Sequence, residues 1–479
     1  MLLGALLENI AYTGTPDLNA EIRYICSNIN DVREDSIFVA IKGQHTNAAE
    51  YIPLAIHLGA KAIVCGPDAP IILSDFIVVE QPRQALALLC SNFYGRPSDD
   101  LHVIGVTGTN GKTTTSYMIR HILANAGKKT GLIGTIEACG GEDCVGMNNT
   151  TPEPWELYGI IKKLRDDGCR YLVMEVSSQG LHQHRTDGIR FDQGVFTNFS
   201  AEHLDYHQSM EEYLKAKMLL IPQSRNIIAN ADCSYFNAFS EIASCQFFSI
   251  EKQADYQAVD ICCELSESRY TFCIKDQHYP VCLSVPGIFN VANSLAALAV
   301  CSHYDIDLQE ACSCLAYFNG VRGRMELLKT DTPYSIMIDF AHTPEGLRQL
   351  LTTARQFIRG RMIVVFGCGG DRDKSKRKQM GKIAGELADY SVITSDNPRT
   401  EDPDQIIFQI RDGMPDGARY TAITDRTQAI AHALRYAKKD DCVILAGKGH
   451  EEYQLINGIK HHYDEREVVR ELLQTNCKI

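Results

Sequence analysis

The chain has 479 residues, of which 45% are hydrophobic and 22% are charged. This length exceeds the size at which a single hydrophobic core stops growing, so we expect about three domains. The formal net charge of -13 excludes a general nucleic-acid-binding protein, whose surface would be basic. Anionic ligands must therefore be held by local clusters of donors and cations.

The 18 cysteines are scattered, without the paired spacing of a zinc site or the density of a short secreted scaffold. No signal peptide pattern precedes them, so we expect reduced thiols in a cytoplasmic protein. Residues 1–7 are apolar but lack a basic start and are too short to span a membrane. They predict a first helix packed on its own domain, and no membrane insertion.

Residues 1 to about 98 predict a small α/β domain. Residues 36–41 are typical of a short buried strand, residues 51–59 of a helix that ends at a glycine, and residues 60–65 of a second strand. Glycine and proline beside two acids in residues 93–100 indicate a linker. A central domain is expected to begin after it.

A glycine-rich turn follows the apolar run at residues 103–106 and precedes a helical pattern that Gly127 ends. Gly108 and Gly111 allow backbone N–H groups to approach an anion, and Lys112 adds a positive charge. The hydroxyl of Thr113 or Thr114 can bind Mg²⁺. A turn that merely joins strand to helix is the alternative, but these features together favour a phosphate-binding loop.

Polar residues follow several further predicted strands, at the sheet edge where open α/β folds bind ligands. The strands of the central part lie at residues 171–176 and 194–198, and a helix is expected over residues 290–304. The last third repeats the pattern after residues 363–366, 391–395 and 442–446, with helical patterns between them. A doubly wound sheet is the economical fold for that part.

Four titratable residues of the central and last parts of the chain have competing interpretations. Glu175 and His203 could ligate Mg²⁺ near bound phosphates, although a lone histidine in a polar loop more often has no such role. On spacing alone, Lys217 is a solvated lysine of a helix. His342, after the strand that ends at Asp339, could stack on a ligand or cap a helix.

The motifs at residues 106–114, 175–178, 197–207, 323–326 and 339–344 stand in one order along the chain. In this order they resemble the Mur ligases, which are ATP-dependent amide-bond ligases of cell-wall precursor synthesis. With the motifs of the last third, the resemblance covers roughly residues 100–455. It implies an α/β protein of three domains: a substrate-binding domain at residues 1–98, an ATP-binding domain at 99–325 and a Rossmann-like amino-acid-binding domain at 326–479.

Residues 367–373, 396–399 and 447–451 are similar to those of the family members that add the third residue of the peptide. The resemblance therefore implies that ATP activates UDP-N-acetylmuramoyl-L-alanyl-D-glutamate as an acyl phosphate, which meso-diaminopimelate attacks. It also implies a cytoplasmic monomer. L-Lysine as the amine is the close alternative. A folylpolyglutamate synthetase, which shares the phosphate loop, and a non-catalytic nucleotide-binding switch are the others.

The resemblance also assigns residues by position. It implies two Mg²⁺ sites, formed by Thr113, Glu175, His203 and Lys217, with Lys217 carbamylated; Lys112, His203 and Lys217 would be catalytic. ATP contacts are implied at Gly108, Thr109, Asn110, Gly111, Lys112, Thr113, Thr114, Asn290, Arg324, Asp339 and His342. Contacts to the UDP-muramoyl dipeptide are implied at Ser27, Gln44, His45, Thr46, Asn149, Thr150, Thr151, Ser177, Gln183 and Arg185.

The amino acid is expected to bind at Arg372, Asp396, Asn397, Pro398, Arg399, Gly447 and Glu451. Arg399 would decide between the two amines, because a planar guanidinium can grip the distal carboxylate that meso-diaminopimelate has and lysine lacks. Glu451 would hold the distal ammonium, which both amines carry. The alternative is that Arg399 pairs with Glu401 or Asp402 in a surface turn.

Overall fold

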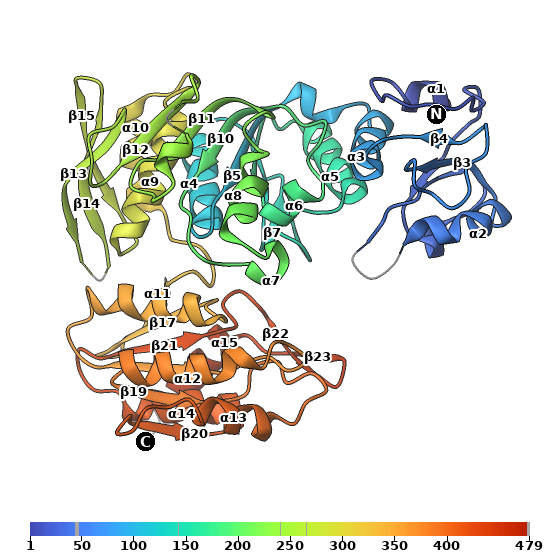
Figure 1. Ribbon diagram of the computed structural model, residues 1–479. Coiled ribbons are helices and arrows are strands. Elements are labelled where there is room, and N and C mark those ends of the chain that lie inside the picture. Colours follow the sequence, from blue (N-terminus) through green and yellow to red (C-terminus); the bar gives the residue numbers. More distant parts are fainter. Residues whose placement is uncertain (44–46, 142, 240, 265, 477–479) are drawn as a thin grey trace. The chain divides into compact units, whose positions relative to one another are not determined.

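The computed structural model describes residues 1–43, 47–141, 143–239, 241–264 and 266–476 (Figure 1). Its contacts divide the chain into two compact units. The first comprises residues 1–257, 274–277 and 292–311, and the second comprises residues 258–273, 278–291 and 312–479. In the described residues, no helix is both long enough and apolar enough to cross a lipid bilayer.

The first unit starts with a small parallel sheet of strand order β1-β2-β3-β4. Its strands are β1 (Tyr24–Cys26), β2 (Ser36–Val39), β3 (Ala60–Cys65) and β4 (Ile77–Val78). Its helices are α1 (Leu3–Leu6), α2 (Ile52–His57) and α3 (Pro82–Phe93), with short 3-10 turns η1 (Ile29–Asp31), η2 (Ala48–Tyr51) and η3 (Pro97–Asp100). The predicted strands and helices of this part are confirmed, including the first helix.

A larger sheet follows, with the order β12-β11-β10-β5-β9-β6-β7-β8 within the first unit. These strands are β5 (His102–Thr107), β6 (Thr130–Ile133), β7 (Glu137–Cys139), β8 (Cys144–Gly146), β9 (Tyr171–Glu175), β10 (Phe191–Phe196), β11 (Ser224–Asn230) and β12 (Cys245–Ser249). Strand β5 pairs in parallel with β9 on one side and β10 on the other. The loops after these three strands therefore share one edge of the sheet.

The helices of this part are α4 (Lys112–Asn125), α5 (Pro154–Asp166), α6 (Ser178–His182), α7 (Leu204–His207), α8 (Met210–Met218) and the 3-10 turn η4 (Phe236–Ala238). Helix α4 buries Met118, Ile119, Ile122 and Leu123, the apolar stripe that the sequence predicts. Strand β13 (Tyr256–Cys263) begins beside β12, and β14 (Ser268–Ile274) and β15 (Gln277–Leu283) follow it in the sheet order.

Two cysteines form a disulfide across the β7–β8 hairpin. Cys139 and Cys144 are directly opposite each other in the antiparallel register, and their sulfur atoms are bonded. The expectation of reduced thiols is wrong for this pair. The sequence spacing did not reveal it, because the hairpin that makes the two residues cross-strand neighbours was not predicted.

The second unit continues with α9 (Ile288–Cys301), which the two units share, α10 (Leu308–Cys314) and η5 (Leu315–Tyr317). Its C-terminal sheet has the order β16-β17-β21-β18-β19-β20. The strands are β16 (Glu326–Leu327), β17 (Ser335–Asp339), β18 (Met362–Phe366), β19 (Tyr390–Ile393), β20 (Tyr420–Ala422) and β21 (Cys442–Ala446). All pairs are parallel except that of β16 with β17.

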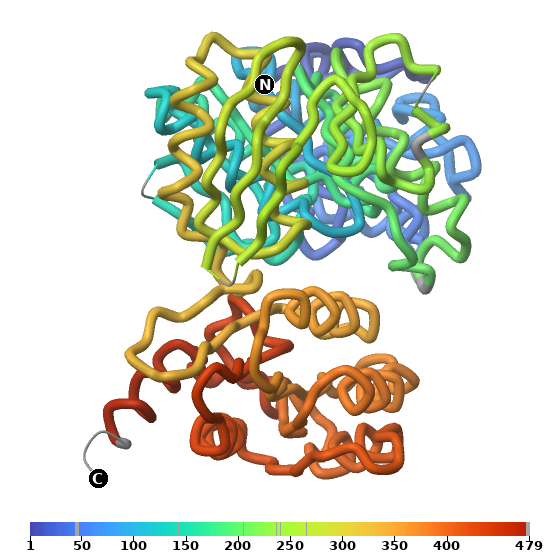
Figure 2. The backbone as a smooth tube through the Cα atoms, turned by 90° about the vertical axis from the view of Figure 1, so that its left-hand side faces the viewer, coloured from blue at the N-terminus to red at the C-terminus, as the bar shows by residue number. Residues whose placement is uncertain are grey.

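Helices cover both faces of this sheet, because its strands are apolar on both sides. Alternate residues of β18 point to opposite faces: Val364 packs with helices α11 (Pro344–Arg355), α12 (Ser375–Leu387) and α13 (Pro403–Arg411). Ile363 and Val365 pack with α14 (Arg426–Tyr436) and α15 (Glu465–Asn476). The predicted doubly wound sheet is confirmed. Figure 2 traces the chain from α11 onward in orange and red, and the hairpin of β22 (Tyr453–Ile456) and β23 (Ile459–His462) belongs to this C-terminal part.

Candidate active site

The glycine-rich turn, residues 108–111, connects β5 to α4 and is called the phosphate loop below. Gly111 has φ of 83° and occupies the N-cap position of α4. Gly108 has φ of 147°, and a Cβ atom there would lie 1.9 Å from Oγ1 of Thr197. Both glycines are therefore required by backbone conformation and close packing. The N-terminus of a 14-residue helix follows, and the positive end of its dipole favours an anion.

Two lysines donate to the same backbone carbonyl of this loop. Lys112 Nζ lies 2.9 Å from the Gly108 oxygen and 2.8 Å from that of Thr109. Lys217 Nζ lies 2.8 Å from the same Gly108 oxygen. Lys217 is only 2% exposed, so the expectation of a solvated helix lysine is wrong. Burial lowers the pKa of Lys217 well below its ordinary value, and the nearby charge of Lys112 lowers it further.

Glu175 is a fully buried carboxylate beside the loop. Its Oε2 atom accepts from the Thr113 hydroxyl at 2.9 Å and from the Thr135 hydroxyl at 2.9 Å. Its Oε1 atom accepts from the backbone N–H of Thr135 at 2.9 Å. The structure thus brings Glu175 to Thr113, and Thr114 makes no such contact. These hard oxygen donors have the chemistry that Mg²⁺ prefers.

His203 and Lys217 lie against the same aromatic ring. The Lys217 amine is 4.5 Å from the centroid of the buried Tyr213 ring, and the imidazole of His203 is 6.0 Å from it. The Tyr213 hydroxyl lies 3.3 Å from that of Thr109 in the phosphate loop. His203 has φ of 55° and remains partly exposed, so the turn directs a polar ring to solvent beside the loop.

Several residues assigned to the UDP-muramoyl dipeptide meet at the ends of β9 and α6. Arg185 donates to the Thr151 carbonyl at 2.7 Å and to Gln183 Oε1 at 2.8 Å. Thr151 Oγ1 accepts from the Ser177 N–H at 2.9 Å. The Thr150 hydroxyl lies 3.1 Å from that of Thr135, which contacts Glu175. Asn149 is exposed just before them in the same loop.

The first sheet carries the remaining residues assigned to this substrate. Ser27 is exposed directly after β1. Gln44, His45 and Thr46 lie outside the described residues. A hollow at the carboxyl ends of β2 and β3 is lined by Lys42, Asn47, Asp68 and Arg83, among others, and sequence reasoning did not single out these polar side chains.

In the second unit, the residues assigned to the nucleotide gather around Phe340. The Arg324 guanidinium is 5.2 Å from the Phe340 ring centroid, and the rings of His342 and His450 are 4.6 and 4.8 Å from it. Asp339 accepts from the N–H groups of Met325 and Ala341, each at 2.8 Å. Asn290 is separate: its side chain donates to the Pro286 carbonyl at the start of α9.

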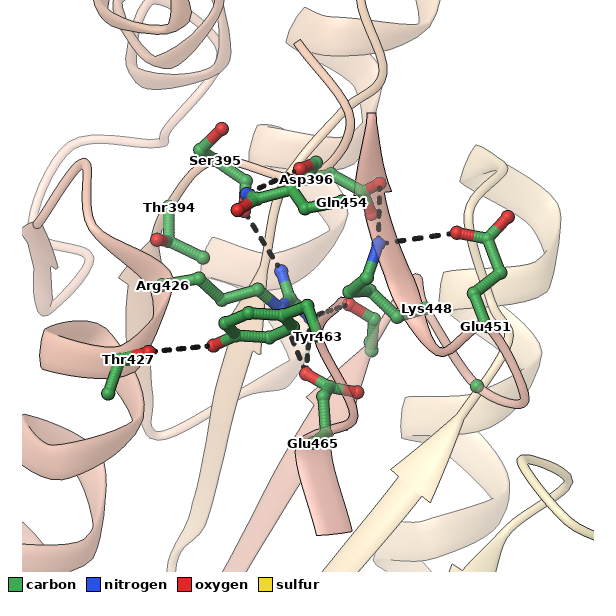
Figure 3. A network of polar contacts seen from close by, with 12 residues as sticks. Thr394, Ser395, Asp396, Arg426, Thr427, Lys448, Glu451, Gln454, Tyr463 and Glu465 are labelled. Atoms are coloured by element: carbon green, nitrogen blue, oxygen red, sulfur yellow. Dashed lines mark hydrogen bonds and ion pairs between the residues drawn. The ribbon is translucent and has the colours of Figure 1, made fainter. Parts of the chain in front are cut away.

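Residues assigned to the amino acid meet where β19 and β21 end. Asp396 and Asn397 follow β19, and Gly447 to Glu451 follow β21 (Figure 3). Asn397 Nδ2 donates to Glu451 Oε2 at 2.9 Å. A Cβ atom on Gly447 would lie 2.6 Å from Asp396 Oδ2, so only glycine fits. Burial alone would raise the pKa of Asp396, but Lys448 and Arg426 outweigh it and lower the pKa.

Arg399 has φ of 54° and is held by backbone contacts to β22: its N–H donates to the Leu455 carbonyl at 3.0 Å. Its guanidinium donates to the Gly370 carbonyl at 2.7 Å. The expected alternative partner, Glu401, binds Arg377 instead at 2.8 Å. Among the described residues no carboxylate forms an ion pair with Arg399, so the surface-turn interpretation is wrong. Pro398 is buried beside it, and Arg372 is exposed in the preceding loop.

Sequence reasoning missed four residues of these clusters: Thr135, Tyr213, Asn293 and Lys448. Thr135 stands just after β6, at the same sheet edge as Glu175, and that position was an available signal. Asn293 accepts from Thr115 of α4 at 3.3 Å and lies where a Cβ of Gly111 would clash. No local pattern marks Tyr213 or Asn293, because only the packing of distant helices brings them to the loop.

Comparisons with known proteins agree with this geometry. The Mur ligase middle domain matches residues 106–301, and the Mur ligase glutamate ligase domain matches residues 323–449. The UDP-N-acetylmuramoyl-L-alanyl-D-glutamate–2,6-diaminopimelate ligase of Caldanaerobacter subterraneus is 40% identical over 487 residues and 100% of both chains. The ligase of the same name from Clostridium tetani is 40% identical over 486 residues, covering 99% of both.

Solved structures give the same result. One described as UDP-N-acetylmuramoyl-L-alanyl-D-glutamate–2,6-diaminopimelate ligase is 28% identical, covers 99% of both chains and has a TM-score of 0.72. MurF ligase from Thermotoga maritima, solved with ADP, is 21% identical, covers 96% of this chain and 99% of its own, and has a TM-score of 0.58. At that identity it bears on the fold alone.

The chain belongs to the Mur ligase family. It is accordingly an ATP-dependent ligase that joins an acid to an amino acid, with the family's α/β architecture of N-terminal, central and C-terminal domains, each built on its own sheet.

Proposed function

We propose that this chain adds meso-diaminopimelate to UDP-N-acetylmuramoyl-L-alanyl-D-glutamate in peptidoglycan synthesis. Relatives that carry this activity in their names match it over its whole length at 40% identity. We also propose that it works as a monomer in the cytoplasm. Sequence similarity alone leaves the lysine-adding alternative open, so the choice of amine rests on the site.

Arg399 is the observation that carries the choice of amine. The acids near it in sequence are engaged elsewhere: Glu401 binds Arg377, and Asp402 caps helix α13. The Arg399 guanidinium therefore keeps donors for a ligand in addition to its bond to the Gly370 carbonyl. The second carboxylate of meso-diaminopimelate can accept two parallel hydrogen bonds from it, whereas lysine offers no acceptor there.

The reaction has two steps. The D-glutamyl carboxylate oxygen bonds to the γ-phosphorus of ATP and the bond to ADP breaks, which gives an acyl phosphate. The amine nitrogen then bonds to the acyl carbon, the carbon–oxygen bond to phosphate breaks, and a proton leaves the nitrogen. Lys112 and the loop N–H groups offset phosphate charge. Holding the amine beside the acyl phosphate could contribute about 7–11 kcal/mol through effective molarity.

Two Mg²⁺ sites fit the donors near the phosphate loop. Thr113 and Glu175 supply hard oxygen atoms, and His203 lies with Lys217 beside Tyr213. Bound Mg²⁺ would neutralise charge on the phosphates. We propose that Lys217 is carbamylated, since its lowered pKa favours the uncharged amine that reacts with CO₂ and a carbamate would give a carboxylate in place of a cation.

The UDP-muramoyl dipeptide would bind along the loop edge of the first unit. Thr151, Ser177, Gln183 and Arg185 are already joined by hydrogen bonds there. The hollow beside Lys42 and Asn47 is our proposed place for the uridine end of the substrate.

Phosphate release from ATP tests the proposal, measured with the UDP-muramoyl dipeptide and either meso-diaminopimelate or L-lysine. We expect release that requires both the dipeptide and meso-diaminopimelate, with lysine a poor substrate. Equal or better rates with lysine would replace the proposal by the lysine-adding activity. Release with a folate and glutamate would favour the folylpolyglutamate synthetase, and nucleotide binding without amine-dependent release would favour a switch protein.

A further inference from the structure

Lys448 is a fully buried lysine in the loop after β21, between Gly447 and Gly449. Its ammonium lies 3.2 Å from Asn397 Oδ1, 3.2 Å from Glu451 Oε2 and 4.0 Å from Asp396 Oδ1. All three partners are side chains assigned above to the amino-acid site. A buried ammonium is costly unless its donors are satisfied, so these oxygens must stay around it.

We propose that Lys448 is a positioning residue for the amino-acid substrate, acting through Glu451 and Asn397. The inference deepens the proposed function and rests on it. In Figure 3 the end of the Lys448 side chain lies between Asp396 and Glu451.

The contacts fix the direction of the Asn397 amide. Lys448 Nζ and the Leu455 N–H can only donate, so both require the amide oxygen Oδ1. The Nδ2 group must then point the other way, and it donates to Glu451 Oε2 at 2.9 Å. One oxygen of Glu451, Oε2, thus accepts hydrogen bonds from both Asn397 and Lys448. These two bonds hold the carboxylate in one orientation toward a substrate ammonium.

A second buried cation nearby has a different kind of contact. Arg426 pairs with Glu465 at 2.8 Å and donates to the backbone carbonyls of Ser395 and Ala446. It therefore ties the ends of β19 and β21 together and stabilises the scaffold of the loops. Lys448 is bonded to functional side chains instead, so its loss should affect the binding of the amino acid rather than the fold.

The test compares steady-state kinetics of Lys448→Met, Lys448→Arg, Glu451→Gln and the double variant Lys448→Met/Glu451→Gln. KM is measured separately for meso-diaminopimelate, ATP and the UDP-muramoyl dipeptide, together with Tm. Arg361→Met is the matched control. Arg361 also pairs with a buried carboxylate, that of Asp441 at 2.6 Å, but this pair lies at the opposite ends of strands β18 and β21, where they begin.

We expect Lys448→Met to raise KM for meso-diaminopimelate about tenfold or more while KM for the other two substrates changes less than about twofold. Lys448→Arg, which keeps a cation, should recover part of the affinity. In the Glu451→Gln background, Lys448→Met should add less than about twofold. Arg361→Met should lower Tm without changing KM for meso-diaminopimelate.

Three results would overturn the role of Lys448: a parallel rise in all three KM values, a full additional effect in the Glu451→Gln background, or an unchanged KM for meso-diaminopimelate in Lys448→Met. If Lys448→Met does not fold, the double variant, which removes charge from both partners, is compared with Glu451→Gln. A KM for meso-diaminopimelate that differs by more than about tenfold between these two variants would overturn the role of Lys448. An unchanged KM in Glu451→Gln would instead overturn the proposed amino-acid site, and the role of Lys448 with it.

Discussion

Lys217 of helix α8 donates a hydrogen bond to the backbone carbonyl oxygen of Gly108 over 2.8 Å, so a buried amine lies directly beneath the phosphate loop. Lys112 donates to the same oxygen from the first turn of α4. Two ammonium groups that share one acceptor repel each other, and that repulsion adds to burial in lowering the pKa of Lys217. The predictions for these two lysines differ because their surroundings differ.

For Lys217→Ala we expect kcat to fall by at least about 100-fold, because the carbamate that would hold a Mg²⁺ ion beside the phosphates is lost. Short carboxylic acids added to the assay should restore part of the activity if the native group is a carbamate. Steady-state rates with and without added acetate provide the measurement. Lys215→Ala is the matched control from the same helix, since Lys215 is exposed and pairs with Glu211, and it should keep full activity. A wild-type rate for Lys217→Ala, or an unmodified amine by mass spectrometry of active enzyme, would contradict the carbamate.

Lys112→Ala should reduce kcat by about 10²–10³-fold with Tm nearly unchanged, since its amine contacts loop carbonyls rather than the core. Kinetics at saturating ATP and Mg²⁺, together with a thermal melt, measure both quantities. Lys128→Ala, beyond the other end of helix α4, should leave kcat unaffected. An unchanged rate for Lys112→Ala would remove the loop from the mechanism.

Arg399→Ala should lose most of its kcat/KM with meso-diaminopimelate while its small rate with lysine hardly changes. A site that holds a polar group of its substrate can reject the analogue that lacks it by about 10⁴–10⁵-fold, because its own donors then go unpaired. Both amines are compared in wild type and variant. Arg411→Ala, at the end of helix α13, serves as a control arginine of the same unit. A variant that retains the selectivity of the wild type would show that another residue makes the choice.

His450 should make stability depend on pH. Burial lowers the pKa of His450 to about 4, and the charges of Arg324 and Arg466 add to this effect. The unfolded chain therefore binds a proton near pH 6.5, where the folded chain does not. Stability should fall as the pH drops from about 6.5 toward 4, by about 1–2 kcal/mol between pH 7 and pH 5.

Thermal melts of wild type and His450→Gln at pH 7 and pH 5 measure this effect. The variant should lose less stability on acidification than the wild type, because glutamine takes up no proton. His57→Gln, in the exposed part of α2, should behave as wild type. Equal pH dependence in wild type and His450→Gln would show that the folded and unfolded chains bind a proton at His450 equally, and would contradict the lowered pKa.

Local patterns in the sequence determined the fold of this protein to a large extent. The apolar runs predicted β3, β9 and β21, and the helical spacing after the phosphate loop predicted α4 with its buried stripe. The role of Gly108 and Gly111 could be predicted from the sequence, because a tight turn between a strand and a helix requires backbone conformations that glycine adopts readily. Such features depend on neighbours in the chain, so the chain alone specifies them. The motif resemblance likewise indicated the family before any contact was known.

Only the tertiary structure decided which side chains meet. Lys217 has the spacing of a solvated lysine, and it is buried because α8 packs its face against the loop after β5, more than a hundred residues earlier. The Cys139–Cys144 bond depends on the register of a hairpin. Glu401 pairs with Arg377 rather than with Arg399. Lys448, after β21, donates to Asn397, after β19, and so connects the loops that follow these two strands. The partners of the charged side chains are set by the free energy of burying and satisfying charges in the folded protein, which no local pattern encodes.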